Sequence, residues 1–217
     1  MRYSKQQHET MPSMREISPA VNCSAEDFLR VFPSEVHQLV AEIRRQKQEG
    51  LRILPSTSLL DHSTLLTRVY RHRLLDAVAA LVDENLFGRS EMCLQFADLL
   101  CRALIHLGLP AKFVSGWAIY FTAAGQEVFR WKHTWVRVES EAIDGNVDSL
   151  FENPTVPKGV KLAPYWGPIA QMPSDRRLRE ERCSPLPPDQ DVSDTWWPEL
   201  RAWLDKELSP KLLAKPE

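Results

Sequence analysis

The stretch "RSEMCLQFADLLCRALIHLGLPAKFVSGW", residues 89–117, decides the fold of this chain. Its first part has the marks of an amphipathic helix, with Ser90 as N-cap, Gly108 as C-cap and Pro110 just beyond. From Ala111 onward, β-branched and aromatic residues predict a strand instead. The stretch therefore predicts a helix that leads directly into β-structure, and an α+β fold.

The sequence before this stretch reads as helical. Residues 1–22 are polar and predict a flexible N-terminal arm. Three helices are then expected, each with a start or stop signal: "AEDFLRVF" after Ser24, "SEVHQLVAEIRRQKQEG" between Pro33 and Gly50, and "HSTLLTRVYRHRLLDAVAALVDENLFG" after an Asp61 cap.

The sequence after the stretch alternates as strands do. The runs "AKFVSGWAIYFT", "EVFRWKHTWVRV" and a short "AID" predict an antiparallel hairpin or meander. We therefore expect one domain over 23–175, helical over 23–108 and β-rich over 111–150.

Proline becomes frequent from Asn153 onward, which predicts ordered loops and a wrapping tail rather than more sheet. Residues 176–217 are expected to be a Pro-rich tail that ends in the amphipathic helix "TWWPELRAWLDKEL".

Composition excludes several classes of protein. The chain has 217 residues, of which 43% are apolar and 26% charged, as in ordinary globular domains. A net charge of −2 gives no electrostatic reason to expect a nucleic-acid partner. No signal-like N-terminus and no long apolar run is visible, so we expect a cytoplasmic protein with no membrane partner. The four cysteines have neither disulfide-framework nor zinc-ligand spacing, so no metal and no cofactor is expected.

Cys93 is the first candidate for chemistry. It would be the third residue of a helix capped by Ser90, where free N–H groups and the helix dipole stabilise a thiolate. The alternative is a small apolar residue on a buried helix. Cys101 falls in the apolar stripe of the same helix and is expected to be core, and Cys23 and Cys183 are assigned no role.

A nucleophilic cysteine needs a base, and "KHTWVRV", residues 132–138, supplies His133. His106 follows Cys93 by thirteen residues on the same predicted helix, about 20 Å along its axis and out of reach. The other histidines precede Cys93, in the arm or on helical segments, where a surface role is expected. His133 is either the base or a ring packed against its tryptophan neighbours.

The base in turn needs a group that orients its ring. The strand that carries His133 turns at "ESE" and returns through Ala142 and Ile143, which brings Asp144 near the level of His133. Asp144 is the expected partner. Asp148 is the second candidate, with a turn carboxylate as its alternative role.

These residues resemble the transglutaminase-like superfamily, whose members are cysteine enzymes with a papain-like arrangement of Cys, His and Asp. The resemblance covers residues 85–152 and is carried by "LGLPAKFVSGW" and "HTWV", with Thr134 where alanine is more usual. It implies a papain-like core in which the nucleophile, at a helix N-terminus, packs on a small antiparallel sheet.

The resemblance also implies a reaction. Cys93 would attack a peptide or protein amide and form an acyl-thioenzyme, His133 would carry the proton, Asp144 would orient His133, and the Cys93 N–H would be one oxyanion donor. Water or an amine would then take the acyl group. Glu91 stands where the family often has glycine, which leaves open a protein-binding module that keeps the fold without its chemistry. A metal-dependent hydrolase would need ligands that the sequence does not offer.

The remaining aromatic and basic segments have structural interpretations. Trp117 and Trp135 are expected to be core, and "APYWGP", residues 163–168, is a candidate wall of the cleft. The segment "PSDRRLREER", residues 173–182, predicts a solvated face of paired charges rather than an anion site.

Overall fold

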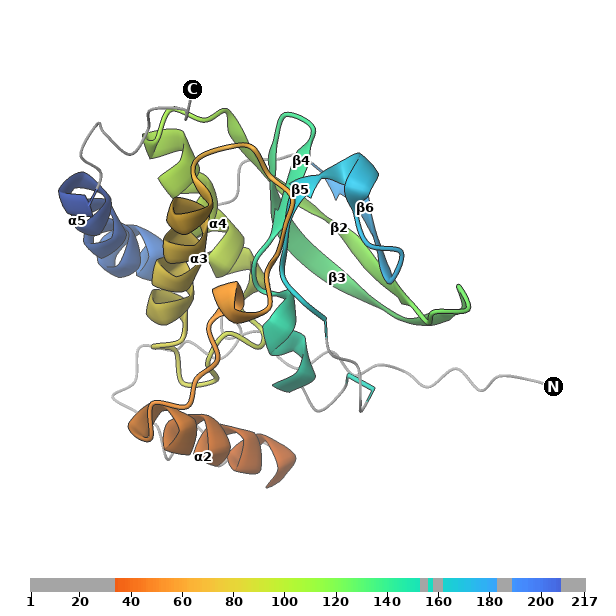
Figure 1. Ribbon diagram of the computed structural model, residues 1–217. Coiled ribbons are helices and arrows are strands. Elements are labelled where there is room, and N and C mark those ends of the chain that lie inside the picture. The colour runs from red at the N-terminus through yellow and green to blue at the C-terminus, as the bar shows by residue number, and fades with distance from the viewer. Residues whose placement is uncertain (1–33, 153–155, 158–161, 183–188, 208–217) are drawn as a thin grey trace. The chain divides into compact units, whose positions relative to one another are not determined.

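The computed structural model describes residues 34–152, 156–157, 162–182 and 189–207 (Figure 1). By its contacts the chain divides into two units, residues 1–37 and 38–217. Nearly all described residues belong to the second unit. The predicted arm and the predicted helix over 25–32 lie outside the described residues.

Six strands of the second unit form one sheet, in the order β1-β5-β4-β3-β2-β6. Neighbouring strands are antiparallel, except that β1 and β5 are parallel. The strands are β1 Leu60–Asp61, β2 Ala111–Phe121, β3 Glu127–Val138, β4 Glu141–Asp144, β5 Tyr165–Pro168 and β6 Arg176–Arg182. The predicted α+β class is confirmed.

Helices α3, α4 and α5 lie to one side of this sheet (Figure 1). Figure 1 shows α3 and α4 next to one half of it, with α5 beyond α4. The α-helices are α2 Ser34–Gln48, α3 Arg68–Val82, α4 Cys93–His106 and α5 Trp197–Glu207, which continues a π-helical turn over Asp191–Trp196. Short 3₁₀ turns are η1 Pro55–Thr57, η2 Val147–Glu152 and η3 Ile169–Gln171.

The main core lies between the helices and one face of the sheet. Leu74 and Val78 of α3 and Leu100 and Leu104 of α4 are fully buried there, in contact with side chains that alternate on the sheet. From the strands, Val136, Val138 and Ile143 join this core, and from α5 Leu200 and Leu204 do. Even-numbered residues of β3 therefore face the helices.

The opposite face of the sheet has its own, smaller clusters. Val114, Trp135 and Ala142 form one, and Ala118 and Tyr120 pack with Val147, Leu150 and Val156 in another. Trp135 is core as predicted. Trp117 is not: it is only half-buried, on the other face of β2, and its indole Nε1 donates to Glu181.

Two helix starts were predicted wrongly. The helix expected after Asp61 begins at Arg68, because Thr67 caps it by accepting a hydrogen bond from the Tyr70 N–H. Asp61 instead ends β1 and binds Arg71. The helix expected after Ser90 begins at Cys93. Ser90 is buried and its hydroxyl caps nothing within the described chain.

The prediction of no further sheet after Asn153 was also wrong. β5 pairs with β4 and β1, and β6 pairs with β2, so residues expected in a loop and a tail are part of the sheet. Tyr165 and Trp166 of "APYWGP" are fully buried and belong to the core rather than to a cleft wall. No helix in the described part of the chain is long and apolar enough to cross a membrane.

Candidate functional site

His133 and Asp144 are brought together by the register of β3 and β4. Val136 of β3 pairs with Ile143 of β4. One residue further along, Asp144 therefore lies opposite Trp135. His133 is then the diagonal neighbour of Asp144 on the same face of the sheet. Diagonal neighbours are about 7–8 Å apart, within reach of long side chains. His133 Nε2 lies 2.8 Å from Asp144 Oδ1, and both side chains are buried.

The surroundings of His133 favour the charged ring. Burial alone would lower the pKa of His133, but the Asp144 carboxylate and, with a smaller effect, Cys93 outweigh it and raise the pKa to about 10. The Asp144 carboxylate thus favours the protonated form of the ring. Its other nitrogen, Nδ1, is buried and has no hydrogen-bond partner among the described residues. The Trp135 ring stacks beside it, with centroids 6.3 Å apart.

Cys93 is the first residue of α4, two positions nearer to the helix terminus than the sequence predicted. Its backbone N–H is one of those that lack an intrahelical acceptor, and the positive end of the helix dipole lies there. The side chain is half-buried, and its Sγ lies 4.0 Å from Thr134 Oγ1. The thiol is therefore accessible and close to the strand that carries His133.

The end of β4 explains how Cys93 meets this strand. β4 pairs with β3 only over Val136–Val138. Beside His133 and Thr134, this edge of β3 is free of a neighbouring described strand. The Thr134 side chain points to the helix side of the sheet and the His133 side chain to the opposite side. Cys93 nevertheless lies next to Thr134 and also raises the pKa of His133. The three predicted residues Cys93, His133 and Asp144 thus lie in one neighbourhood.

Two further residues lie near this neighbourhood and were not singled out from the sequence. The hydroxyl of Tyr120 is buried and without a partner in the described chain. Burial, and then the charge of Asp144, raise its pKa well above the ordinary value, with Cys93 adding to the effect. Arg176 is buried, donates to the Ala163 carbonyl at 2.7 Å, and is also influenced by Asp144. The alternation of β2 against β3 puts Tyr120 on the His133 face, which is the signal that could have found it.

Asp148, the second candidate for the orienting acid, has another partner. Its two carboxylate oxygens accept hydrogen bonds from Arg89 Nη1 and Nη2, each at 2.9 Å, in the fork geometry typical of a strong pair. Asp148 thus lies in a buried charge cluster rather than beside His133.

The other cysteines and His106 do not join the site. Cys101 is buried, and burial raises the pKa of its thiol to about 11, so it is core as predicted. His106 binds Asp205 on α5 at 2.8 Å. Cys23 and Cys183 lie outside the described residues.

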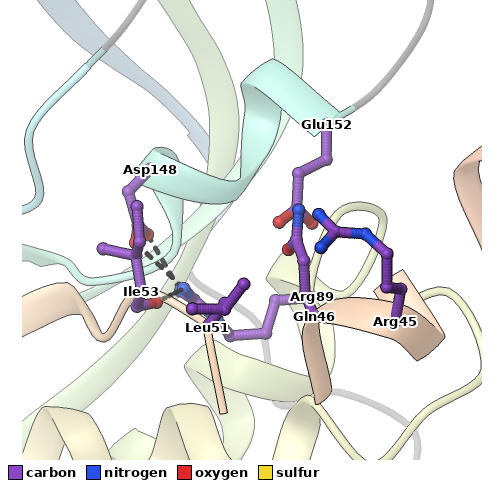
Figure 2. A pocket seen from close by; sticks show the side chains of 7 residues that line it. All are labelled: Arg45, Gln46, Leu51, Ile53, Arg89, Asp148 and Glu152. Atoms are coloured by element: carbon purple, nitrogen blue, oxygen red, sulfur yellow. Dashed lines mark hydrogen bonds and ion pairs between the residues drawn. The ribbon is translucent and has the colours of Figure 1, made fainter. Parts of the chain in front are cut away.

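The pocket drawn in Figure 2 belongs to the charge cluster. It has a volume of about 150 Å³, and the lining includes Arg89, Asp148 and Glu152 but none of Cys93, His133 and Asp144. Figure 2 shows Asp148 joined to Arg89 by hydrogen bonds. The positive charge of Arg89 is thus already paired with the Asp148 carboxylate. Among the described residues, no group of three or more His, Cys, Asp and Glu side chains is placed to hold a metal ion.

Comparison of the chain with protein-family models, with curated proteins and with solved structures found no match. The resemblance to the transglutaminase-like superfamily therefore stays a prediction from the residues quoted above.

Proposed function

We propose that this protein is a transglutaminase-like cysteine enzyme that forms an acyl-thioenzyme on a peptide or protein amide. The observation that carries the proposal is the buried pair of His133 Nε2 and Asp144 Oδ1, 2.8 Å apart, next to a half-buried Cys93 at the N-terminus of α4. A third group that fixes the ring of a base is what nucleophilic catalysis by a thiol requires.

Each residue has a separate task. Asp144 holds His133 through Nε2, which leaves Nδ1 as the nitrogen that exchanges a proton with the Cys93 sulfur. Once its proton is on His133, the Cys93 sulfur is the nucleophile, because the thiolate rather than the thiol attacks a carbonyl. The Cys93 N–H has no acceptor within α4, so in this proposal it donates to the oxyanion that forms on the attacked carbonyl.

The reaction proceeds in two halves. The Cys93 thiolate adds to the amide carbonyl, the carbon–nitrogen bond breaks, and the leaving amine takes the proton from His133. Water or a second amine then attacks the thioester, gives its proton to His133, and the carbon–sulfur bond breaks. Water as acceptor gives hydrolysis and an amine gives acyl transfer, with the same three residues.

Alkylation tests the proposal without a known substrate. At pH 6 iodoacetamide should modify Cys93 at least about tenfold faster than an ordinary exposed thiol, because only the thiolate reacts. Cys101 of the same chain is the internal control and should stay unmodified. The sites are identified by peptide mass mapping of the intact, folded protein.

Two variants complete this test. Asp144→Asn and His133→Ala should each slow the alkylation of Cys93 at pH 6, while circular dichroism verifies that the protein is folded. A Cys93 that reacts like an ordinary thiol in all three proteins would sink the catalytic proposal and favour a binding module.

A further inference from the structure

One half of the helix-side face of the sheet is not covered by α3 and α4. Figure 1 shows β2 and β3 as a long hairpin whose tip lies away from these helices, with β6 beside β2. Trp117 pairs with Lys132 and Arg179, and Ile119 with Arg130 and Arg177, so their side chains share this face. We call it the basic face, formed by Trp117, Phe121, Arg130, Lys132, Arg177 and Arg179.

The basic face is solvated, unlike the reverse side of the same strands. The side chains of Arg130, Lys132 and Arg179 are 50%, 59% and 56% exposed. On the reverse side, Ala118 and Tyr120 are buried beneath Val147 and Leu150.

Positive charge exceeds negative charge on this face. Glu127 pairs with Arg130, and Glu181 is shared between Lys132 and Arg179, so among the described residues four cations face two carboxylates. This excess departs from the paired charges that the sequence predicted for residues 173–182. The chain as a whole has a net charge of −2. The excess of cations is therefore a local feature that attracts acidic groups.

Aromatic rings alternate with these cations. Lys132 Nζ lies 4.5 Å from the centroid of the Trp117 ring, and Arg177 Cζ lies 5.5 Å from that of Phe121. Stacking on a ring holds a cation on the sheet surface, and the rings add apolar contact area for a peptide backbone.

The basic face continues to Cys93. Thr134 lies on the same face of β3, two residues from Lys132 and so roughly 7 Å away along the strand. Cys93 Sγ is 4.0 Å from the Thr134 hydroxyl. A chain extended over Lys132 and Trp117 would thus lead to the thiol.

We propose that the basic face docks an acidic, extended peptide segment and leads it to Cys93. The inference rests on the proposed function for its substrate, an amide-bearing chain, and adds that the residues flanking the reactive amide are Asp and Glu. Their carboxylates bind Arg130, Lys132, Arg177 and Arg179 in competition with Glu127 and Glu181.

Fluorescence anisotropy with the full chain tests the docking apart from the chemistry. The probe is a short fluorescein-labelled peptide with glutamates on both sides of one glutamine, and two controls replace the glutamates by lysine or by serine. The glutamate peptide should bind at least about tenfold more tightly than either control, and its affinity should fall as salt is added.

Charge-reversal variants test whether the peptide binds at the basic face. Lys132→Glu combined with Arg179→Glu should weaken binding of the glutamate peptide by about tenfold or more, because each reversal replaces an attraction by a repulsion. Lys112→Glu is the matched control: it is an exposed lysine of β2, the strand between β3 and β6, but its side chain lies outside the basic face, and it should change binding less than about twofold.

Protection of the thiol links docking to the site. Saturating glutamate peptide should slow the alkylation of Cys93 in the wild type and not in the double variant. Equal affinity for all three peptides, or full binding by the double variant, would overturn the proposal. So would nucleic acid or anionic vesicles that bind through Lys132 and Arg179 when the peptide does not. An unreactive Cys93 with intact peptide binding would overturn the proposed function alone.

Discussion

His133 couples the site to the stability of the fold, because its protonation differs between the folded and unfolded chain. In the unfolded chain the pKa is about 6.5, whereas in the fold Asp144 and Cys93, acting against burial, raise it to about 10. The folded state therefore binds more protons between these values. Stability from this ionisation is complete below about pH 6.5 and is lost as the pH rises through about 10.

The first prediction follows from this sign. Between pH 7 and 9.5 the free energy of unfolding should fall by more than about 1.4 kcal/mol, the value of one pKa unit. In Asp144→Asn the fall should be much smaller, since burial then lowers the pKa of His133 and the partner that raised it is gone. Urea unfolding across this pH range measures both proteins. Parallel pH profiles would contradict the assigned role of Asp144.

A buried hydroxyl without a partner gives the second prediction, at Tyr120. The Tyr120→Phe variant should have the same free energy of unfolding as the wild type or a higher one, because no hydrogen bond in the described structure offsets the desolvation of the buried hydroxyl. Tyr165→Phe is the control, since its hydroxyl donates to the Pro168 carbonyl at 2.6 Å. That variant should lose about 1 kcal/mol. Thermal unfolding compares them, and an equal loss in Tyr120→Phe would show that its hydroxyl has a partner.

At the scale of the elements, the pairing of β2 with β6 depends on Gly116. A Cβ there would overlap with the Arg179 carbonyl oxygen and lie 2.9 Å from its carbon, both backbone atoms that cannot rotate away. The two strands can pair at this point only because the residue has no side chain.

The third prediction is that Gly116→Ala destabilises the fold by about 2 kcal/mol or more, the range of overpacking, and opens β6. Gly125→Ala is the control, at a turn with φ +77° and open space around it, where the strain of the left-handed region costs about 1 kcal/mol. Amide exchange over 176–182 should accelerate only in Gly116→Ala. Unchanged protection of β6 would contradict the clash.

The elements that the sequence predicted correctly are those with long periodic patterns. The strands over 111–122 and 127–138 and the helix ending near Gly108 are within a few residues of those observed, because alternation and helical spacing are local. β5 and β6 are held by distant partners instead. "YWGP" pairs with β1 and β4, and the charged "RRLREER" lies at the sheet edge, where charged side chains keep other strands away.

At the scale of the whole molecule, the sequence singled out Cys93, His133 and Asp144 and kept Asp148 as the second candidate partner of His133. The register of β3 and β4 brings Asp144 next to His133, whereas Asp148 pairs with Arg89, which lies fifty-nine residues before it. The N-cap assigned to Ser90 failed for a related reason: the backbone carbonyl next to it, on Arg89, is bound by Asn146 and Ser149. Tertiary contacts thus set the start of α4.

Arg89 ties together segments that are far apart in the chain. Its side chain is 2% exposed, and its guanidinium reaches Asp83 after α3, Asp148 in η2 and the Ile53 carbonyl before η1. Burial raises the pKa of Asp148, although Arg89 opposes this effect. Without Arg89, a carboxylate would be left unpaired in the interior, which is the costly way to break a buried ion pair.

The fourth prediction is that Arg89→Met destabilises the fold by about 3–5 kcal/mol, because Asp148 loses its partner. Asp83 keeps a partner in this variant, because Arg52 still donates a hydrogen bond to it at 2.6 Å. Adding Asp148→Leu should recover more than half of the loss by removing the unpaired charge. Arg130→Ala, which breaks a half-exposed pair with Glu127, should cost less than about 1 kcal/mol. Urea unfolding at neutral pH measures all four proteins. If the double variant were no more stable than Arg89→Met, the loss would come from the contacts of the arginine with Ile53 and Asp83 rather than from the stranded Asp148.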